Sequence, residues 1–302
     1  MAATSHVWAP LVGTEGDSGC NTQAPAKAGS AGAEAPAIRG GISMAASTSE
    51  SAPSRVPLRC ALAFAALYAA YEAPEGVGGR LLGNAVVAAV MMTLFHAVAF
   101  GVGRWLGYRR NGFHAYALEW HGSALARALA VMLVLKPLSV LVGVRLGLLQ
   151  VLPLEKPVVG TALLVAVLGV AVSTFVPSVA EDIVARGFWF RAWPVAGQRA
   201  GYVLLSAGVF VLTHVYRLGN GPLEWLMLFC TGLAYAAAVA RTGSLWGAVG
   251  LHWGWNLANS LMDLRLDVTA VGQGGRMLST ATGLVALALV VLLPAKRRAV
   301  AP

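Results

Sequence analysis

The chain has 302 residues, of which 57% are hydrophobic and only 12% are charged. A soluble globular domain carries roughly 25% charged residues, so this composition excludes an ordinary soluble enzyme and predicts an integral membrane protein. Helices are expected, because open strands cannot satisfy their backbone hydrogen bonds in lipid. The net charge of +9 does not indicate a nucleic-acid partner, since the arginines lie mainly at the ends of apolar stretches, where they anchor a chain at the membrane surface.

Residues 1–55 differ in composition from the rest of the chain. They are rich in Ala, Ser, Gly and Pro and show no hydrophobic period, which is typical of a disordered tail. They do not resemble a signal peptide, because no apolar core follows a basic start. Met44 is an alternative start codon. Beyond the tail, we expect N-terminal transmembrane helices at 56–155 and a second transmembrane region at 156–298.

Eight apolar segments follow the tail, and a membrane-spanning helix needs about 20 such residues. They cover residues 58–71, 81–103, 125–152, 166–193, 200–217, 223–240, 244–261 and 279–294. The first is short, and the third is predicted to kink or break at Pro137, because proline removes a helical hydrogen bond. The predicted fold class is therefore all-α, a polytopic helical membrane bundle of about eight transmembrane helices.

The basic residues predict how this bundle lies in the membrane. If the N-terminus is inside, the inner connections carry more arginines than the outer ones, which places both termini in the cytoplasm. The high Ala, Gly and Arg content is typical of a GC-rich bacterial genome, so we expect a bacterial plasma membrane. Residues 112–122 are less apolar and are predicted to lie at the membrane interface. Lys136 and Arg145 are expected to extend to the membrane surface.

Ionisable side chains interrupt the apolar segment at 166–193. Because such side chains are costly in a membrane interior, their presence indicates a functional site. Asp182 and Arg186 are four residues apart, so they can pair on one helical face. Glu181 points about 100° away from Asp182 and is expected to face the bundle interior. A carboxyl group in that position suits a general base or acid.

Two later segments supply histidines. His214 follows Phe210 by one helical turn, and His252 precedes Asn256 by one turn. A helical hairpin brings Glu181 and His214 to a similar depth in the bilayer. A glutamate and a histidine can hold and deprotonate water, and a second histidine with an asparagine can stabilise the oxyanion that forms at an attacked carbonyl. The combination predicts a site that hydrolyses peptide bonds.

These motifs resemble those of the CPBP family of intramembrane proteases, which includes the type II CAAX prenyl endopeptidases and bacteriocin-processing or immunity proteins. The family pattern is E-E-x-x-x-R, then F-x-x-x-H, then H-x-x-x-N. The resemblance covers about residues 160–262. The chain presents the three motifs in the same order, as Glu181-Asp182-x-x-x-Arg186, Phe210-x-x-x-His214 and His252-x-x-x-Asn256.

The resemblance implies an intramembrane endopeptidase with the region 156–298 as its catalytic core. Glu181 and His214 match the family residues that activate water. His252 and Asn256 match the residues that stabilise the oxyanion. The expected partners are membrane lipid and a membrane-bound or lipidated protein substrate.

The supporting positions of the family pattern fall on Asp182 and Arg186, with Asp182 standing where the family has a second glutamate. The family has also been labelled metalloprotease, and Glu181, His214 and His252 could fill a catalytic zinc site. We favour a metal-free mechanism, because a helical bundle can also place these groups around a water molecule.

Two other functions fit the same sequence. The first is a non-catalytic membrane immunity or scaffold protein that keeps the fold. The second is a small transporter in which Glu181 and the histidines relay protons. The transporter is less favoured, because the chain shows no repeated halves of the kind many transporters have. Cleavage lost in Glu181→Gln with normal folding would favour the protease.

Overall fold

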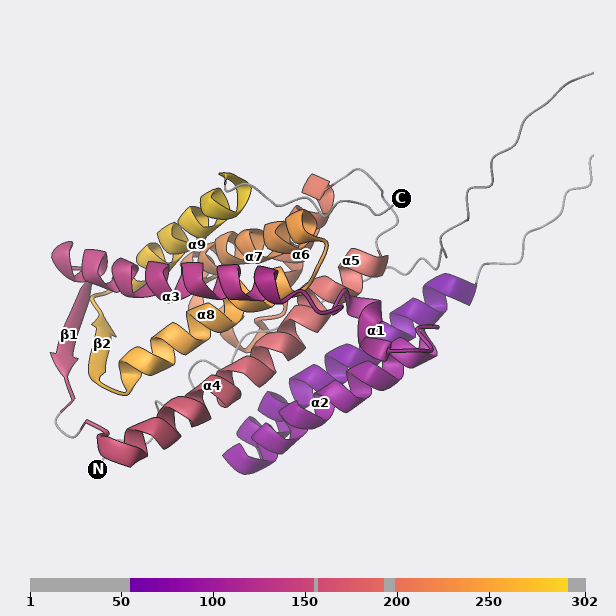
Figure 1. Cartoon of the computed structure of the whole chain (residues 1–302), viewed down its shortest axis with the longest axis horizontal. Coiled ribbons are helices and arrows are strands. Elements are labelled where there is room, and N and C mark those ends of the chain that lie inside the picture. Colours follow the sequence, from indigo (N-terminus) through magenta and orange to yellow (C-terminus); the bar gives the residue numbers. More distant parts are fainter. Residues whose placement is uncertain (1–54, 155–156, 193–198, 293–302) are drawn as a thin grey trace, which may run out of the picture.

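The structure is a computed structural model that describes residues 55–154, 157–192 and 199–292. These residues form an all-α membrane bundle with one small two-stranded sheet (Figure 1). The predicted tail at 1–55 and Met44 lie outside the described residues, apart from Arg55. In chain order the elements are α1 (Arg55–Ala73), the π-helix η2 (Pro74–Leu81), α2 (Ala85–Trp105), the 3-10 helix η3 (Gly112–Tyr116), α3 (Gly122–Arg145), β1 (Leu149–Pro153), α4 (Gly160–Asp182), the π-helix η4 (Ile183–Gly187), α5 (Phe188–Ala192), α6 (Arg199–Leu212), the 3-10 helix η5 (Val215–Asn220), α7 (Pro222–Thr242), α8 (Trp246–Asp263), β2 (Leu266–Ala270) and α9 (Gly274–Leu292).

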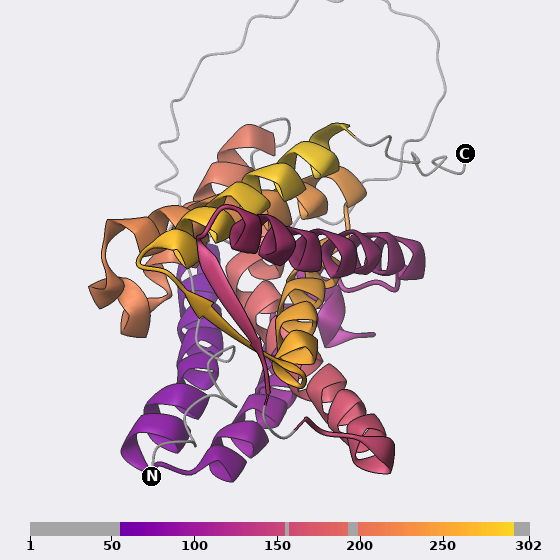
Figure 2. The same ribbon diagram turned by 90° about the vertical axis from the view of Figure 1, so that its left-hand side faces the viewer.

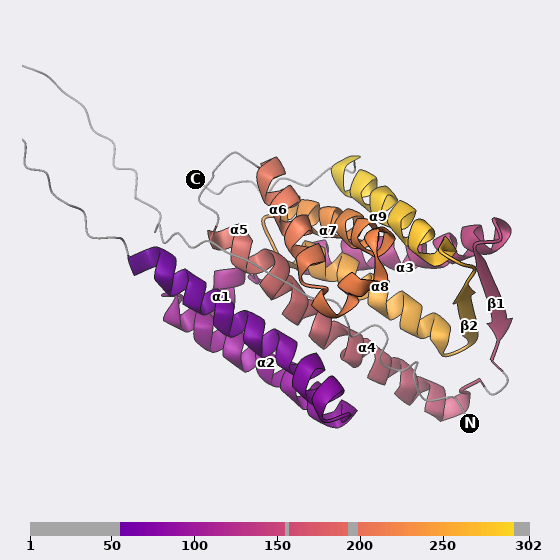
Figure 3. The same cartoon turned by 180° about the vertical axis from the view of Figure 1, so that it is seen from behind.

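Helix α4 lies between two groups of helices. On one side, α1 and α2 pack together and α2 contacts α4. On the other side, α8 contacts α4 and is itself packed against α3 and α7, with α6 and α9 against α7 (Figures 1 and 3). The β1–β2 ribbon joins the ends of α3, α8 and α9 at one side of the molecule (Figure 2). This arrangement places the C-terminal end of α4 in the interior of the bundle, where ionisable side chains need protein partners.

Each of the eight predicted apolar segments overlaps a helix of the described chain, although the third continues into the strand β1. The predicted count of eight membrane spans is not confirmed, however. Helix α6 is short, and α1 and α8 are less apolar than the other long helices. Within the described residues, five stretches are long and apolar enough to cross a membrane, namely Ala85–Trp105, Gly122–Arg145, Gly160–Arg191, Pro222–Thr242 and Gly274–Leu292.

The third predicted segment, residues 125–152, differs from its prediction at Pro137 and at its C-terminal end. Helix α3 runs without a break through Pro137, so of the predicted kink or break the break is excluded. The helix ends at Arg145, and Gly147, two residues later, has a positive φ of 68°. The amide of Leu148 donates to the carbonyl of Gly143 over 2.8 Å, which closes the helix in a Schellman arrangement. The following residues form β1, which pairs antiparallel with β2.

Residues 112–122 were expected at the membrane interface, but part of this segment is buried inside the bundle. Tyr116 is fully buried, and its hydroxyl donates to the carbonyl of Ala99 over 2.8 Å. The carbonyl of Ala117 accepts from the amide of Leu245 over 2.9 Å. The segment therefore links α2 to the start of α8.

Helices α3 and α8 approach closely because α8 presents glycines to α3. A Cβ atom on Gly250 would lie 2.6 Å from the carbonyl oxygen of Leu125, and one on Gly254 would lie 2.8 Å from Cβ of Met132. Small residues allow helix backbones to approach in membranes, where packing and interhelical hydrogen bonds drive association. The same contact fixes the direction in which His252, between the two glycines, leaves its helix.

Candidate active site

The acidic residues of the first motif occupy the last turn of α4, directly before the π-helix η4. A π-turn widens the helix and is frequently found at functional sites. Side chains of α6 hydrogen-bond to carbonyls of this turn. The hydroxyl of Ser206 donates to the carbonyl of Ala185 over 2.9 Å, and that of Tyr202 donates to the carbonyl of Arg186 over 3.2 Å. The irregular turn is thus held by its neighbour.

Asp182 and Arg186 form the expected i,i+4 ion pair. The Nη1 atom of Arg186 lies 2.5 Å from Oδ1 of Asp182, and both side chains are fully buried. The guanidinium group also lies over two aromatic rings, 4.3 Å from the centroid of Phe210 and 5.0 Å from that of Tyr235. Such stacking stabilises a cation that has left water. The pair therefore fixes the end of α4 relative to α6 and α7.

Glu181 is buried beside this pair, with 6% of its surface exposed. Its Oε2 atom accepts a hydrogen bond of 3.3 Å from the hydroxyl of Tyr71 on α1. The Nε2 atom of His252 lies 3.5 Å from the same oxygen. Among the described residues, Oε1 of Glu181 has no hydrogen-bond partner. A buried carboxylate oxygen normally has a partner, so this atom marks a place for a water molecule or a substrate group.

His252 lies between the two carboxylates. Its Nδ1 atom is 3.6 Å from Oδ1 of Asp182, while its Nε2 atom faces Glu181. The imidazole ring stacks on Tyr235 of α7, with 5.2 Å between the ring centroids. One turn further along α8, the amide nitrogen of Asn256 donates to the hydroxyl of Ser178 over 3.1 Å. These contacts fix both side chains on the face of α8 that meets α4.

His214 lies at the junction between α6 and η5 and is 2% exposed. Its Nδ1 atom is 2.7 Å from the carbonyl oxygen of Phe210, one turn earlier. Because a carbonyl only accepts, Nδ1 carries the proton in this contact. A neutral imidazole then presents Nε2 as an acceptor. The local backbone thereby sets the tautomer of this histidine.

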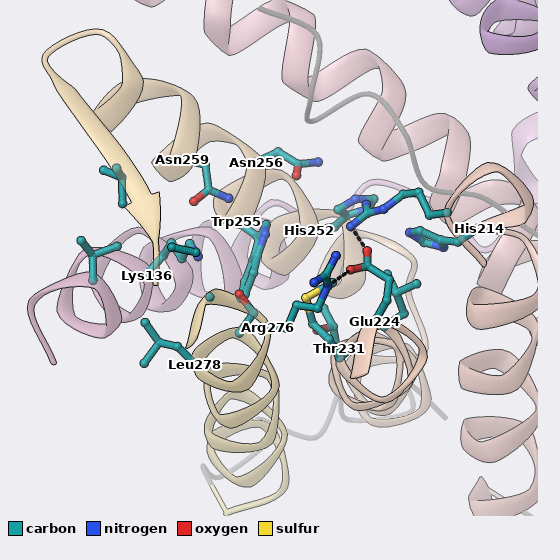
Figure 4. Close-up of a pocket in the computed structure, with 18 of the residues that line it drawn as sticks. Lys136, His214, Glu224, Thr231, His252, Trp255, Asn256, Asn259, Arg276 and Leu278 are labelled. Atoms are coloured by element: carbon teal, nitrogen blue, oxygen red, sulfur yellow. Dashed lines mark hydrogen bonds and ion pairs between the residues drawn. The ribbon is translucent and has the colours of Figure 1, made fainter. Parts of the chain in front are cut away.

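All four predicted catalytic residues line one pocket of about 550 Å³. Figure 4 labels three of them, His214, His252 and Asn256. Glu181 comes from α4, His214 from the α6–η5 junction, and His252 and Asn256 from α8. The supporting residues Asp182 and Arg186 are absent from the pocket lining and lie behind it. The structure thus brings the predicted residues together, while their chemical roles stay predictions.

The same distances bear on the alternative zinc site of Glu181, His214 and His252. In the described ranges, no group of three His, Cys, Asp or Glu side chains is arranged to hold a metal ion. The two nitrogens of His252 face two different carboxylates, and Nδ1 of His214 is taken by the carbonyl of Phe210. The three residues do not fit a zinc site as they stand, so no step is assigned to a metal.

The pocket also has a charged rim that the motifs did not reveal. Glu224, at the start of α7, is 2% exposed and lies between two arginines. It forms an ion pair with Arg217 of η5 and a second one with Arg276 of α9, whose Nε lies 2.7 Å from Oε2 (Figure 4). A single acidic residue thus ties together three elements near His214.

Sequence reasoning missed residues that contact the predicted ones or line the same pocket from distant positions. Glu224 was detectable, because it is an acidic residue beginning an apolar helix. The two tyrosines and the serine carry no local signal, since a tyrosine or serine in an apolar helix is common. The missed residues are Tyr71, Ser178, Arg217, Glu224, Tyr235 and Arg276.

These observations define a helical membrane protein with buried acidic and imidazole side chains that converge on one interior pocket. Residues 162–258 match a family model described as type II CAAX prenyl endopeptidase Rce1-like. The matched stretch includes every motif residue from Glu181 to Asn256 and confirms the resemblance to the CPBP proteases. At the level of the family, it supports a CAAX-type intramembrane protease. Neither the curated proteins nor the solved structures compared with the chain include a match.

Proposed function

We propose that this protein is an intramembrane endopeptidase that hydrolyses a peptide bond of a membrane-bound or lipidated protein. The supporting observation is that Glu181, His214, His252 and Asn256 line one interior pocket in which Oε1 of Glu181 lacks a hydrogen-bond partner among the described residues. The family match over residues 162–258 agrees with this chemistry.

In the first step, Glu181 and His214 hold a water molecule. The water gives a proton to the Glu181 carboxylate, and its oxygen attacks the carbonyl carbon of the scissile peptide. The acceptor Nε2 of His214 orients this water, because Nδ1 donates to the carbonyl of Phe210. The new C–O bond pushes the carbonyl electron pair onto the substrate oxygen, which becomes an oxyanion.

The oxyanion is stabilised by N–H groups of His252 and Asn256. The 3.5 Å separation between Nε2 of His252 and Glu181 exceeds an ordinary hydrogen bond, so this N–H can turn to the substrate. Asn256 has two N–H groups and gives one to Ser178. The C–N bond then breaks, Glu181 returns its proton to the leaving nitrogen, and the products are a carboxylic acid and an amine.

Asp182 and Arg186 act as positioning residues in this scheme. They lie behind the pocket, and the Asp182 carboxylate faces the Nδ1 atom of His252 at 3.6 Å. The shorter side chain of Asp182, where the family has glutamate, still reaches Arg186 at 2.5 Å. The substitution is therefore compatible with activity.

We further propose that the protein resides in a bacterial plasma membrane with both termini in the cytoplasm. The excess of arginines on one set of connections supports this orientation. Reporter fusions at each terminus would measure it, and a reporter active only on the outer side would contradict it.

The decisive test is Glu181→Gln in protein purified into lipid nanodiscs, assayed against a library of lipidated and transmembrane peptides. Loss of a general base is expected to lower the cleavage rate at least about 100-fold. Glu119→Gln is the matched control, because Glu119 pairs with Arg191 away from the pocket. Cleavage by Glu181→Gln at the wild-type rate would exclude this role. A folded wild type that cleaves no peptide would favour the non-catalytic scaffold instead.

A further inference from the structure

Lys136 is a buried cation that the proposed mechanism does not use. It lies in the middle of α3 and was expected to extend to the membrane surface. The expectation is wrong, since only 8% of its surface is exposed. Arg145, at the end of the same helix, is exposed as expected. The Lys136 side chain instead turns toward the pocket that holds Glu181 and His252.

The ammonium group of Lys136 lies 4.1 Å from the ring centroid of Trp255. It makes no hydrogen bond or ion pair with any residue in the described parts of the chain. Asp263, at the exposed end of α8, attracts it without forming an ion pair. A buried cation that forms no ion pair is costly. A site that keeps one therefore favours an anionic ligand.

The position of Lys136 in the pocket indicates what that ligand is attached to. Figure 4 shows Lys136 on one side of the pocket and His214 on the other, with Trp255 and His252 between them. A polypeptide bound at the catalytic groups can therefore extend past the Trp255 ring toward the ammonium group. Asn259, one turn beyond Trp255, lines the same side and offers amide donors.

We propose that Lys136 is a specificity-determining residue that binds a carboxylate of the substrate. This inference rests on the proposed protease function. The carboxylate comes either from the free C-terminus of the substrate or from an acidic side chain, since both present the same two oxygens to an ammonium group. Binding this group places the chain across Trp255 and presents the scissile bond to Glu181.

The test uses one library of lipidated peptides made in three forms. The first has a free C-terminal carboxylate, the second a C-terminal amide, and the third has glutamine and asparagine in place of acidic side chains. A charge-assisted hydrogen bond is expected to favour the form with the recognised carboxylate by about 10- to 100-fold in the specificity constant. Loss with the amide form identifies the terminus, and loss with the third form identifies a side chain.

The variants separate recognition from folding. Lys136→Met should abolish the preference between forms, and Lys136→Arg should restore it. Arg145→Met removes a cation from the same helix outside the pocket and should keep the wild-type preference. A ratio measured within one variant does not depend on how much of that variant folds. Equal cleavage of the three forms by the wild type would overturn the proposal.

A binding measurement distinguishes failure of this inference from failure of the proposed function. Glu181→Gln protein in nanodiscs is titrated with the fluorescently labelled libraries and their affinities are compared. Tighter binding of one carboxylate form, lost in the Glu181→Gln, Lys136→Met double variant, supports the carboxylate site even without cleavage. Equal binding of all forms, or no binding of any, overturns it.

Discussion

Two adjacent carboxylates at the end of α4 have different surroundings. Asp182 is fully buried against Arg186, whereas Glu181 reaches the pocket and keeps one oxygen without a hydrogen-bond partner among the described residues. The difference follows from the helix, because consecutive residues point about 100° apart. One acid thus lies in a buried ion pair, and its neighbour faces the pocket.

The Asp182–Arg186 pair should be a main source of local stability. Arg186→Met leaves Asp182 buried without its partner, and removing one member of a buried pair costs about 3–5 kcal/mol. We expect a clear drop in the free energy of unfolding, measured by denaturant titration in detergent micelles. The matched control is Arg191→Met, whose partner Glu119 is partly exposed, and a loss of at most about 1 kcal/mol is expected there. Equal losses in the two variants would contradict this account.

At the scale of single residues, the sequence predicted which side chains of one helix lie next to each other. The spacing of Asp182 and Arg186 determines their pairing, and the spacing of His252 and Asn256 determines their common face. It could not predict Tyr71, which lies 110 residues from Glu181 and reaches it only through packing of α1. Helical spacing determines neighbours within an element, and tertiary packing determines the others.

At the scale of the element, the contact between α3 and α8 positions the two site residues of α8, His252 and Asn256. Its closeness depends on the absence of side chains at Gly250 and Gly254. The sequence predicted both helices from their apolar residues. It did not predict the π-turn η4 or the β1–β2 ribbon, because hydrophobic periodicity over five residues does not separate such short elements from a helix end.

Gly250→Ala should separate α3 from α8. The added Cβ would lie 2.6 Å from the carbonyl oxygen of Leu125, which is backbone and cannot rotate away. Overpacking of this kind costs about 1–3 kcal/mol, and we expect cleavage to fall as His252 moves from Glu181. Gly169→Ala on α4 is the control, since its Cβ meets nothing within 4 Å. Unfolding titrations and peptide cleavage would be compared, and wild-type behaviour of Gly250→Ala would argue against a tight interface.

At the scale of the whole molecule, the pocket is built from α3, α4, α6, α8, the two strands and the charged rim of η5, α7 and α9. The bundle class was predictable, because composition alone excludes a soluble protein. The count of spans was not, because α6 is short and α8 is polar enough to require protein neighbours. The length of an apolar segment predicts that it forms a helix. The polar residues within that segment determine whether the helix is apolar enough to cross a membrane.

Metal removal tests the mechanism for the molecule as a whole. Because both nitrogens of His252 face carboxylates, we expect cleavage to continue unchanged after treatment with a chelator. Mass spectrometry of the purified protein should find zinc well below one ion per chain. Stoichiometric zinc, with activity lost to the chelator and regained on adding zinc, would make Glu181, His214 and His252 ligands and exclude the metal-free mechanism.

The contacts of Glu181 have a consequence for biogenesis. During translation, Asp182 and Arg186 can neutralise each other as soon as α4 forms, since they are one turn apart. Glu181 must wait for His252, which is synthesised 71 residues later by their positions (252 − 181). At about 5–20 residues per second, this interval is roughly 4–14 s. The insertion machinery therefore has to hold α4 with an incompletely satisfied carboxyl group until α8 emerges, and slow elongation between the two helices should raise the fraction of chains that are degraded.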